Sequence, residues 1–170
     1  MARFILVLPV LAAFVATAQQ QAKIEAGADD QLVSKVENAI RGAEPEWHYT
    51  RAILNAPPPI VPSERVLVAG VWEHDLETGT RDDVHLDLFR VDSRPDAEMS
   101  LSEVRDGKVA KGWRVRRFHI GDEGYLLKFR NGERFELHFR KGTIIVRVSS
   151  NSFRLVQRFA ELAAAQLDTI

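Results

Sequence analysis

Histidines and aspartates gather on what the pattern predicts to be one β-hairpin, and they are the residues best suited to chemistry. Glu73, His74 and Asp75 stand near the end of the first predicted strand, while His85 and Asp87 alternate along the second. Imidazole nitrogens and carboxylate oxygens are ligands of divalent cations, and three or more converging across the hairpin would hold one. The candidate ligands of such a metal-dependent or hydrolytic site are His74, Asp75, His85 and Asp87. The competing interpretation, which we favour, places them on the solvated face of the hairpin.

Signatures of the commoner enzyme classes are missing from the chain. It contains no cysteine, no G-x-S-x-G nucleophile elbow and no H-E-x-x-H zinc motif. Neither the G-x-G-x-x-G nor the G-x-x-x-x-G-K-S/T phosphate loop occurs. The sequence therefore favours a non-enzymatic protein, and no cofactor is expected.

A basic, strand-like segment is the first candidate for binding a partner. Residues 113–118 interleave arginines with aromatic side chains, a composition suited to an anionic groove or surface. The residues predicted to bind, here and on the neighbouring strand, are Arg114, Arg116, Lys128 and Arg130. The alternative is an ordinary solvated strand face, with Trp113 and Val115 turned inward.

The first residues have the layout of a secretory signal peptide. Arg3 precedes an apolar run over residues 4–16, and the small residues Ala16 and Ala18 flank a predicted cleavage site after Ala18. The run is shorter than the roughly 20 residues of a membrane span, and it contains Pro9. We therefore expect a secreted or periplasmic protein with no stable membrane span after cleavage. Export makes nucleic acid an unexpected partner and leaves a protein or a small molecule.

Composition predicts one globular domain behind the signal peptide. Of the 170 residues, 45% are hydrophobic and 28% charged, and removing residues 1–18 leaves the length of one domain. Residues 19–104 carry 8 Lys/Arg and 17 Asp/Glu, whereas residues 105–158 carry 14 and 5. This split indicates either a basic partner-binding face or acidic and basic strands that pair within one sheet. We favour the pairing.

The order of predicted elements indicates a sheet with helices on it. Residues 19–27 are predicted to be a flexible leader, followed by a helix that Asp29 or Asp30 caps and Gly42 ends. Ser93 is predicted to cap a short helix that stops at Gly107, and a final helix follows Ser152. Strands are predicted over residues 47–54, 65–76, 83–92, 112–119, 124–130, 134–140 and 143–150, with an extended or looped proline-rich stretch over residues 55–62.

Alternation in the last third predicts a meander with one apolar face. Phe135, Leu137 and Phe139 share that face, and the Asn131-Gly132 pair just before them is a strong hairpin signal. The polar side chains on the opposite face are Glu136, His138 and Arg140, the pattern of an antiparallel sheet with one buried face. The chain is thus expected to fold as α+β over residues 28–170, an antiparallel sheet of about six to seven strands with an N-terminal and a C-terminal helix packed on it.

Several short segments resemble small secreted bacterial domains of unknown function with a PsbP-like α/β/α sandwich, over roughly residues 65–168. The matching segments are residues 89–93, 95–97, 120–125, 139–142 and 144–148 and the final Ala/Leu-rich helix. The resemblance implies a non-catalytic binding or assembly module. Our expectation is therefore a secreted, non-enzymatic domain that binds a protein or small ligand, with an extracytoplasmic metal-dependent or hydrolytic enzyme as the alternative.

Overall fold

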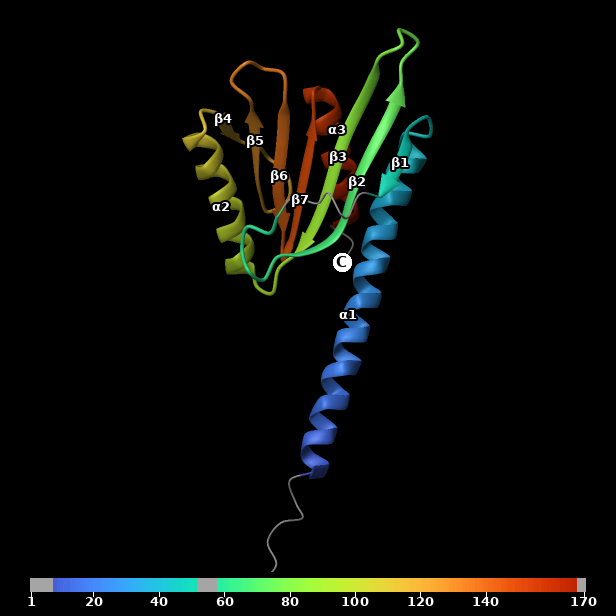
Figure 1. Cartoon of the computed structure of the whole chain (residues 1–170), viewed down its shortest axis with the longest axis vertical. Helices are drawn as coiled ribbons and strands as arrows, with labels where there is room; N and C mark the ends of the chain where they lie inside the picture. The colour runs from blue at the N-terminus through green and yellow to red at the C-terminus, as the bar shows by residue number, and fades with distance from the viewer. Residues whose placement is uncertain (1–7, 52–57, 168–170) are drawn as a thin grey trace, which may run out of the picture.

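The computed structural model describes residues 8–51 and 58–167, with side chains from Ala26 onward, and shows an α+β domain (Figure 1). The predicted fold class is therefore confirmed. The helices are α1 (Leu8–Ala43), α2 (Arg94–Ala110) and α3 (Phe153–Leu167). The strands are β1 (His48–Arg51), β2 (Arg65–Asp75), β3 (Arg81–Arg90), β4 (Arg114–Arg117), β5 (Glu123–Lys128), β6 (Phe135–Lys141) and β7 (Ile144–Ser150).

All seven strands of the described chain form one antiparallel sheet in the order β1-β2-β3-β7-β6-β5-β4. The first three strands and the last four are each consecutive in sequence, and β3 meets β7 at the centre. Residue 87 of β3 stands opposite residue 147 of β7, which in turn stands opposite residue 138 of β6. Two segments that lie far apart in sequence thus build the middle of the sheet.

One face of the sheet carries the apolar core, under α1 and α3. Trp72, Leu137 and Phe159 are fully buried there, and the Phe159 ring contacts the Trp72 ring edge-on at 5.9 Å between centroids. The stripes predicted for both helices pack inward: the buried members are Leu32, Val33, Val36 and Ile40 of α1 and Val156, Phe159, Ala160, Ala163 and Leu167 of α3.

The helix α2 covers the opposite face, as Figure 1 shows with α2 in front of the sheet and α3 behind it. Ser93 caps α2 as predicted, because its hydroxyl accepts from the Asp96 N–H at 3.2 Å. The helix passes through Gly107 and ends at Ala110, beyond the predicted stop. Gly107 costs a helix about 1 kcal/mol relative to alanine, so its place in α2 calls for another reason.

A second, smaller cluster lies under the segment that precedes β2. Val61 packs with Phe89 and Ile145 on the α2 face of the sheet. Only part of the proline-rich stretch can be compared with the prediction, because residues 52–57, which also include the end of the predicted first strand, lie outside the described residues. The described part, from Pro58 to Pro62, contains no helix or strand, as predicted.

The first helix begins earlier than predicted. It is continuous from Leu8, so residues 19–27, the predicted flexible leader, are helical. The reason is composition, since Gln, Ala, Lys and Glu, which dominate this stretch, are good helix formers. Asp29 is not a cap: it lies inside α1 and is buried, where Arg90 Nε donates to its carboxylate at 2.6 Å. Within the described residues, no helix is both long and apolar enough to cross a membrane.

Candidate functional site

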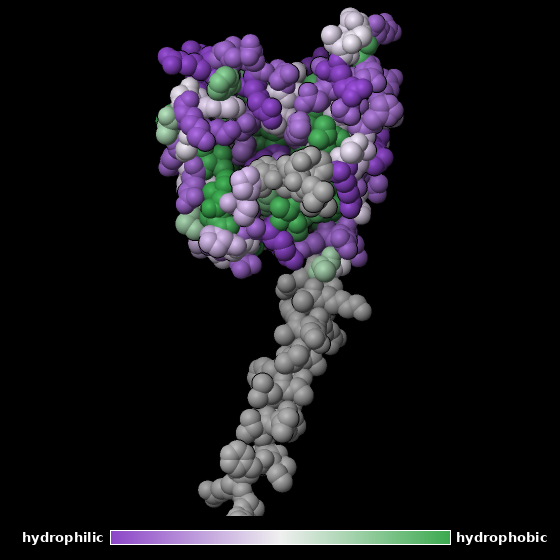
Figure 2. All heavy atoms as spheres, in the orientation of Figure 1, coloured by the Kyte–Doolittle hydropathy of each residue, from purple (hydrophilic) through white to green (hydrophobic). Residues whose placement is uncertain are grey.

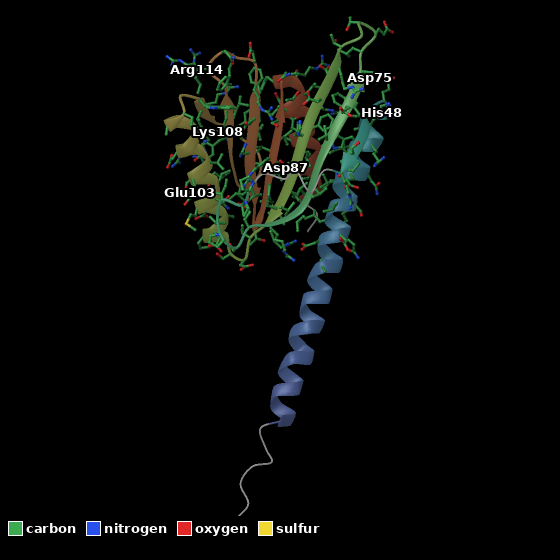
Figure 3. All side chains as sticks on the ribbon, in the orientation of Figure 1. His48, Asp75, Asp87, Glu103, Lys108 and Arg114 are labelled. Atoms are coloured by element: carbon green, nitrogen blue, oxygen red, sulfur yellow. The ribbon has the colours of Figure 1, made fainter. Side chains whose placement is uncertain are left out.

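A cavity of about 530 Å³ opens between α2 and the central strands, on the face opposite the apolar core. Strands β3, β6 and β7 form its floor, α2 forms a wall, and Pro58 and Ile60 line it from the segment before β2. Figure 3 shows Asp87 at the middle of the sheet, with Glu103 and Lys108 projecting from α2 beside it. The volume falls in the range of roughly 300–1,000 Å³ typical of small-molecule sites.

The cavity lies between two segments that pack on the same face of the sheet at different places, α2 and the segment before β2. The buried residues of α2, which include Ala97, Leu101 and Val104, hold it over the half of the sheet formed by β4, β5 and β6. Val61 packs the segment before β2 against Phe89 of β3. The middle strands between these two contacts are left without an apolar lid, and their side chains there are ionisable.

Three ionisable side chains form one row across the floor. Asp87 of β3, Arg147 of β7 and His138 of β6 are successive register partners, so neighbouring members stand about 5 Å apart on adjacent strands. Tyr125 of β5 continues the row. Only 6% of His138 and 5% of Arg147 is exposed, and Asp87 is partly buried, so this row of ionisable side chains lies largely inside the protein. We call Asp87, Arg147 and His138 the central row.

Lys108 and Glu136 hold α2 over this floor. Lys108 Nζ donates to both oxygens of the Glu136 carboxylate, at 2.8 and 2.7 Å. Burial alone would raise the pKa of Glu136, but hydrogen bonds with His138 and Lys108 prevail and lower it to about 2. Glu136 is therefore an anion at neutral pH, and its carboxylate links the helix to the sheet.

His138 is neutral and has one nitrogen without a partner. Burial lowers the pKa of His138, against the opposing effect of Glu136. Nε2 lies 3.0 Å from the Glu136 carboxylate, which is ionised and can only accept. Nε2 therefore carries the hydrogen and donates a hydrogen bond to Glu136. Nδ1 is then an acceptor, and it is buried with no partner among the described residues. An unmade hydrogen bond of this kind costs about 1–3 kcal/mol.

The Arg147 guanidinium is hydrogen-bonded at one end and unpaired at the other. Its Nη2 donates to Glu64, whose other carboxylate oxygen accepts from the Ile60 N–H at 2.6 Å. The guanidinium lies over the Phe89 ring at 4.1 Å from its centroid. Its Nε is buried and has no hydrogen-bond partner within the described part of the chain. The central row therefore contains one unmatched acceptor, on His138, and one unmatched donor, on Arg147.

Asp87 has no hydrogen-bond partner among the described residues. Burial raises its pKa to about 6; Arg147 opposes this shift and Glu136 adds to it. A carboxyl that titrates near neutrality inside a cavity is uncommon in a purely structural position and frequent in functional sites. Asp87 can accept from a bound molecule when ionised and donate to it when protonated.

The hairpin does not assemble the four candidate metal ligands. His85 stands opposite Val71, whereas His74 stands opposite Asp82, a separation of about 10 Å along the strands. The His74 ring stacks on Trp47 at the core side, and Asp75 accepts from Arg81 at 2.7 Å. Only His85 and Asp87 line the cavity. No group of three or more His, Asp or Glu side chains suited to a metal ion occurs in the described residues.

The predicted partner-binding cations lie together at one end of the sheet, outside the cavity. Arg114 of β4 stands opposite Lys128 of β5, and Arg130 follows in the turn before β6. Arg116 lies two residues further along β4, on the same face as Arg114. Its guanidinium is 5.8 Å from the centre of the Phe153 ring. All four are exposed.

Glu136 and His138 are the site residues that the sequence placed wrongly. Their alternation with apolar neighbours predicts the face opposite the core, yet that face is also covered: Glu136, His138 and Arg140 are 8%, 6% and 4% exposed. Alternation identifies residues that share a face but not what covers that face. The remaining signal, ionisable residues at three alternate positions of one strand, is also typical of solvated strands.

Comparison with known proteins provides no relative from which to infer a function: no family model, curated protein or solved structure matches this chain.

Replacing Asp87 with asparagine is expected to stabilise the protein at high pH. The Asp87 carboxyl has a higher pKa folded than unfolded, so its contribution to stability is greatest below about pH 4 and is lost as the pH rises through 6. A shift of about two units corresponds to about 3 kcal/mol. Asp87→Asn should raise the free energy of unfolding in urea by up to that amount near pH 8 and change little near pH 4. Equal effects at both pH values, or a match to the exposed control Asp92→Asn, would contradict the assignment.

Glu136→Gln is expected to show the opposite dependence. Because the pKa of Glu136 is lower in the folded protein, its stabilisation is present above about pH 4.5 and is lost as the pH falls towards 2. The variant should lose about 3 kcal/mol of unfolding free energy at pH 7 and less than half of that near pH 3. Glu133→Gln, on the adjoining exposed turn, is the control. A pH-independent loss would show that Glu136 acts through packing alone.

Proposed function

We propose that this protein is an exported, non-enzymatic binding domain that takes a small polar ligand into the cavity between α2 and the sheet. The observation that carries the proposal is the central row on the cavity floor, whose buried His138 Nδ1 and Arg147 Nε are without partners. Buried polar groups in native proteins are nearly always paired with protein or bound molecules, so two such atoms lining one cavity favour a polar occupant that pairs with both.

The row defines the chemistry that a ligand must offer. His138 Nδ1 needs a donor, Arg147 Nε needs an acceptor, and Asp87 uses either according to its protonation. Hydroxyl groups meet all three needs, because each donates and accepts. Lys111 and Arg134, which are exposed and also line the cavity, add positive charge on the cavity wall. A small hydroxylated molecule, with or without a carboxylate, fits this set.

Two further features support a binding role outside the cytoplasm. The signal-like N-terminus motivates export, with cleavage after Ala18 as the proposed processing step. The short segments that resemble small secreted domains with a PsbP-like sandwich also favour this role, because such domains are typically non-catalytic binding or assembly modules.

Filling the cavity from α2 is expected to abolish ligand binding without damaging the fold. A Cβ at Gly107 would meet nothing within 4 Å, and Gly107 lines the cavity. Gly107→Leu should therefore occupy the space while improving the intrinsic helix propensity of α2. Native mass spectrometry of the protein from its exported fraction should show a retained small molecule on the wild type and none on this variant. The wild-type mass should correspond to a chain that begins at Gln19.

Gly42→Leu is the matched control, since Gly42 also lies in a helix with open space around it but away from the cavity. This variant should keep the retained molecule. Retention by Gly107→Leu would place the ligand elsewhere on the protein, and a wild type that carries nothing would exclude a tightly held ligand.

The second candidate is an extracytoplasmic hydrolase, and Asp87 is the observation that favours it. A carboxyl with a pKa near 6 in a cavity can take a proton from water at neutral pH. If so, Asp87→Asn should abolish turnover of an ester or glycoside panel by the purified protein but leave the retained molecule of the binding assay in place. Activity that survives this substitution would exclude Asp87 as the base.

A further inference from the structure

Apolar side chains are exposed at one end of the molecule, where α2 ends and β5 turns into β6. Val109 is 54% exposed and Phe129 is 38% exposed, and Trp113 lies between them in sequence with its ring 5.0 Å from that of Phe129. We call Val109, Trp113 and Phe129 the aromatic corner. Figure 1 shows the end of α2, the start of β4 and the β5–β6 turn together at the upper left of the molecule.

The local structure holds these rings at the surface. Gly112 takes a φ of 79°, which turns the chain out of α2, and the Trp113 N–H donates back to the Lys108 carbonyl at 3.0 Å. Lys108 Nζ lies 3.9 Å from the centre of the Trp113 ring. The Phe129 carbonyl accepts from the Gly132 N–H, which places Phe129 at the start of a tight turn. The rings are thus fixed before any partner arrives.

Cations adjoin the aromatic corner in sequence: Arg114 follows Trp113, and Lys128 and Arg130 flank Phe129. Lys128 projects towards the α3 face, with Nζ 5.3 Å from the centre of the Phe135 ring, and Trp113 projects towards α2, so rings and cations are both presented at this end of the sheet. Arg114 and Lys128 stand opposite each other on the two strands that end there, an arrangement of like charges that destabilises an isolated sheet. Arg114, Lys128 and Arg130 have no carboxylate partner among the described residues. Most other cations of the domain do have one. Figure 2 shows isolated apolar spheres among strongly hydrophilic ones at this end. An unneutralised cluster held against its own repulsion indicates an anionic partner.

We propose that the aromatic corner and its cations Arg114, Lys128 and Arg130 dock this domain on an anionic lipid bilayer. Tryptophan and other aromatic rings settle at the headgroup level of a bilayer, and neighbouring Lys and Arg bind its anionic headgroups. An acidic peptide would need a groove or an open strand along which to lie. The strand edge beside the corner is β4, which is only four residues long, and the cavity is lined by other residues, apart from the neighbouring Lys108. A flat, deformable surface fits such an end best.

The test uses vesicles of phosphatidylcholine alone and of equal parts phosphatidylcholine and phosphatidylglycerol. Every protein variant carries the same N-terminus, so that any affinity of residues 1–18 for lipid cancels. The wild type is expected to sediment with the anionic vesicles and far less with the neutral ones, to be released by high salt, and to show a blue shift of tryptophan emission. At roughly fivefold per cation, the combined variant Arg114→Gln, Lys128→Gln, Arg130→Gln should bind the anionic vesicles about 100-fold more weakly.

The control removes three exposed cations from other places on the surface. Lys35→Gln, Arg94→Gln and Arg158→Gln, on α1, the first turn of α2 and α3, change the net charge equally and should bind nearly as the wild type does. Phe129→Ser should keep the preference for anionic vesicles but reduce the emission shift. The urea midpoints of the cation variants should stay close to that of the wild type, because surface ion pairs such as Arg94 with Glu98 and Arg158 with Glu44 contribute little to stability.

Three results would overturn the proposal. Equal weakening by the control variant would reduce the effect to net charge, and equal binding of all variants to neutral vesicles would attribute it to the N-terminal apolar run. Binding to polyglutamate as tight as to vesicles, without an emission shift, would identify an acidic protein as the partner instead. None of these outcomes depends on whether the cavity holds a ligand, because the cavity variant Gly107→Leu leaves the corner intact.

Discussion

The burial of charge on the central strands is the constraint on which the rest of this structure depends. An ionised side chain is not left in a protein interior without a partner, since the cost of removing it from water exceeds most single interactions. Arg147 therefore requires Glu64, and Glu136 requires Lys108. These two requirements draw the segment before β2 and the helix α2 onto the same face of the sheet. The cavity is what remains between them.

As a result, the two faces of the sheet are held to their helices by different kinds of interaction. Under α1 and α3 the contacts are mainly apolar and supply most of the hydrophobic stabilisation, with Asp29 of α1 paired to Arg90 at the edge of this core. Under α2 the contacts are ionic and depend on protonation, with Asp87 and Glu136 shifted in opposite directions. Asp87 lowers stability at neutral pH. Residues that remain in a protein at such a cost are usually there for function, because selection for stability alone would replace them.

Local signals in the sequence predict most of the elements and little of the site. Ser93 followed by Pro95 and Asp96 predicts the start of α2, and Asn131-Gly132 predicts the turn into β6, because these features act within a few residues. The sequence predicts that α2 stops at Gly107, but Gly107 lies within the helix and lines the cavity. The central row could not be predicted, since it requires that β3 lie beside β7, and no local pattern determines which distant strands become neighbours.

The charge asymmetry of the sequence has a structural counterpart. The acidic first part and the basic later part of the chain meet through Glu64 with Arg147 and through Glu98 with Arg140, across the same face of the sheet. These contacts join a loop and a helix to the sheet, whereas the sequence predicts that acidic and basic strands pair; Asp87 of β3 opposite Arg147 of β7 is a pair of the predicted kind. The cations around Arg114, which have no such partner, are the part of the asymmetry that pairing does not explain.

The position of β7 has a consequence for how the protein is made. His85 of β3 finds its neighbour only at Ser149, about 60 residues later, and α3, which covers the core face, comes later still. During synthesis the first half of the sheet therefore has an open edge and an uncovered apolar face until almost the whole chain has emerged. Contacts between such distant residues also form slowly. The complete sheet and its apolar cover can therefore form only after nearly the whole chain has been synthesised.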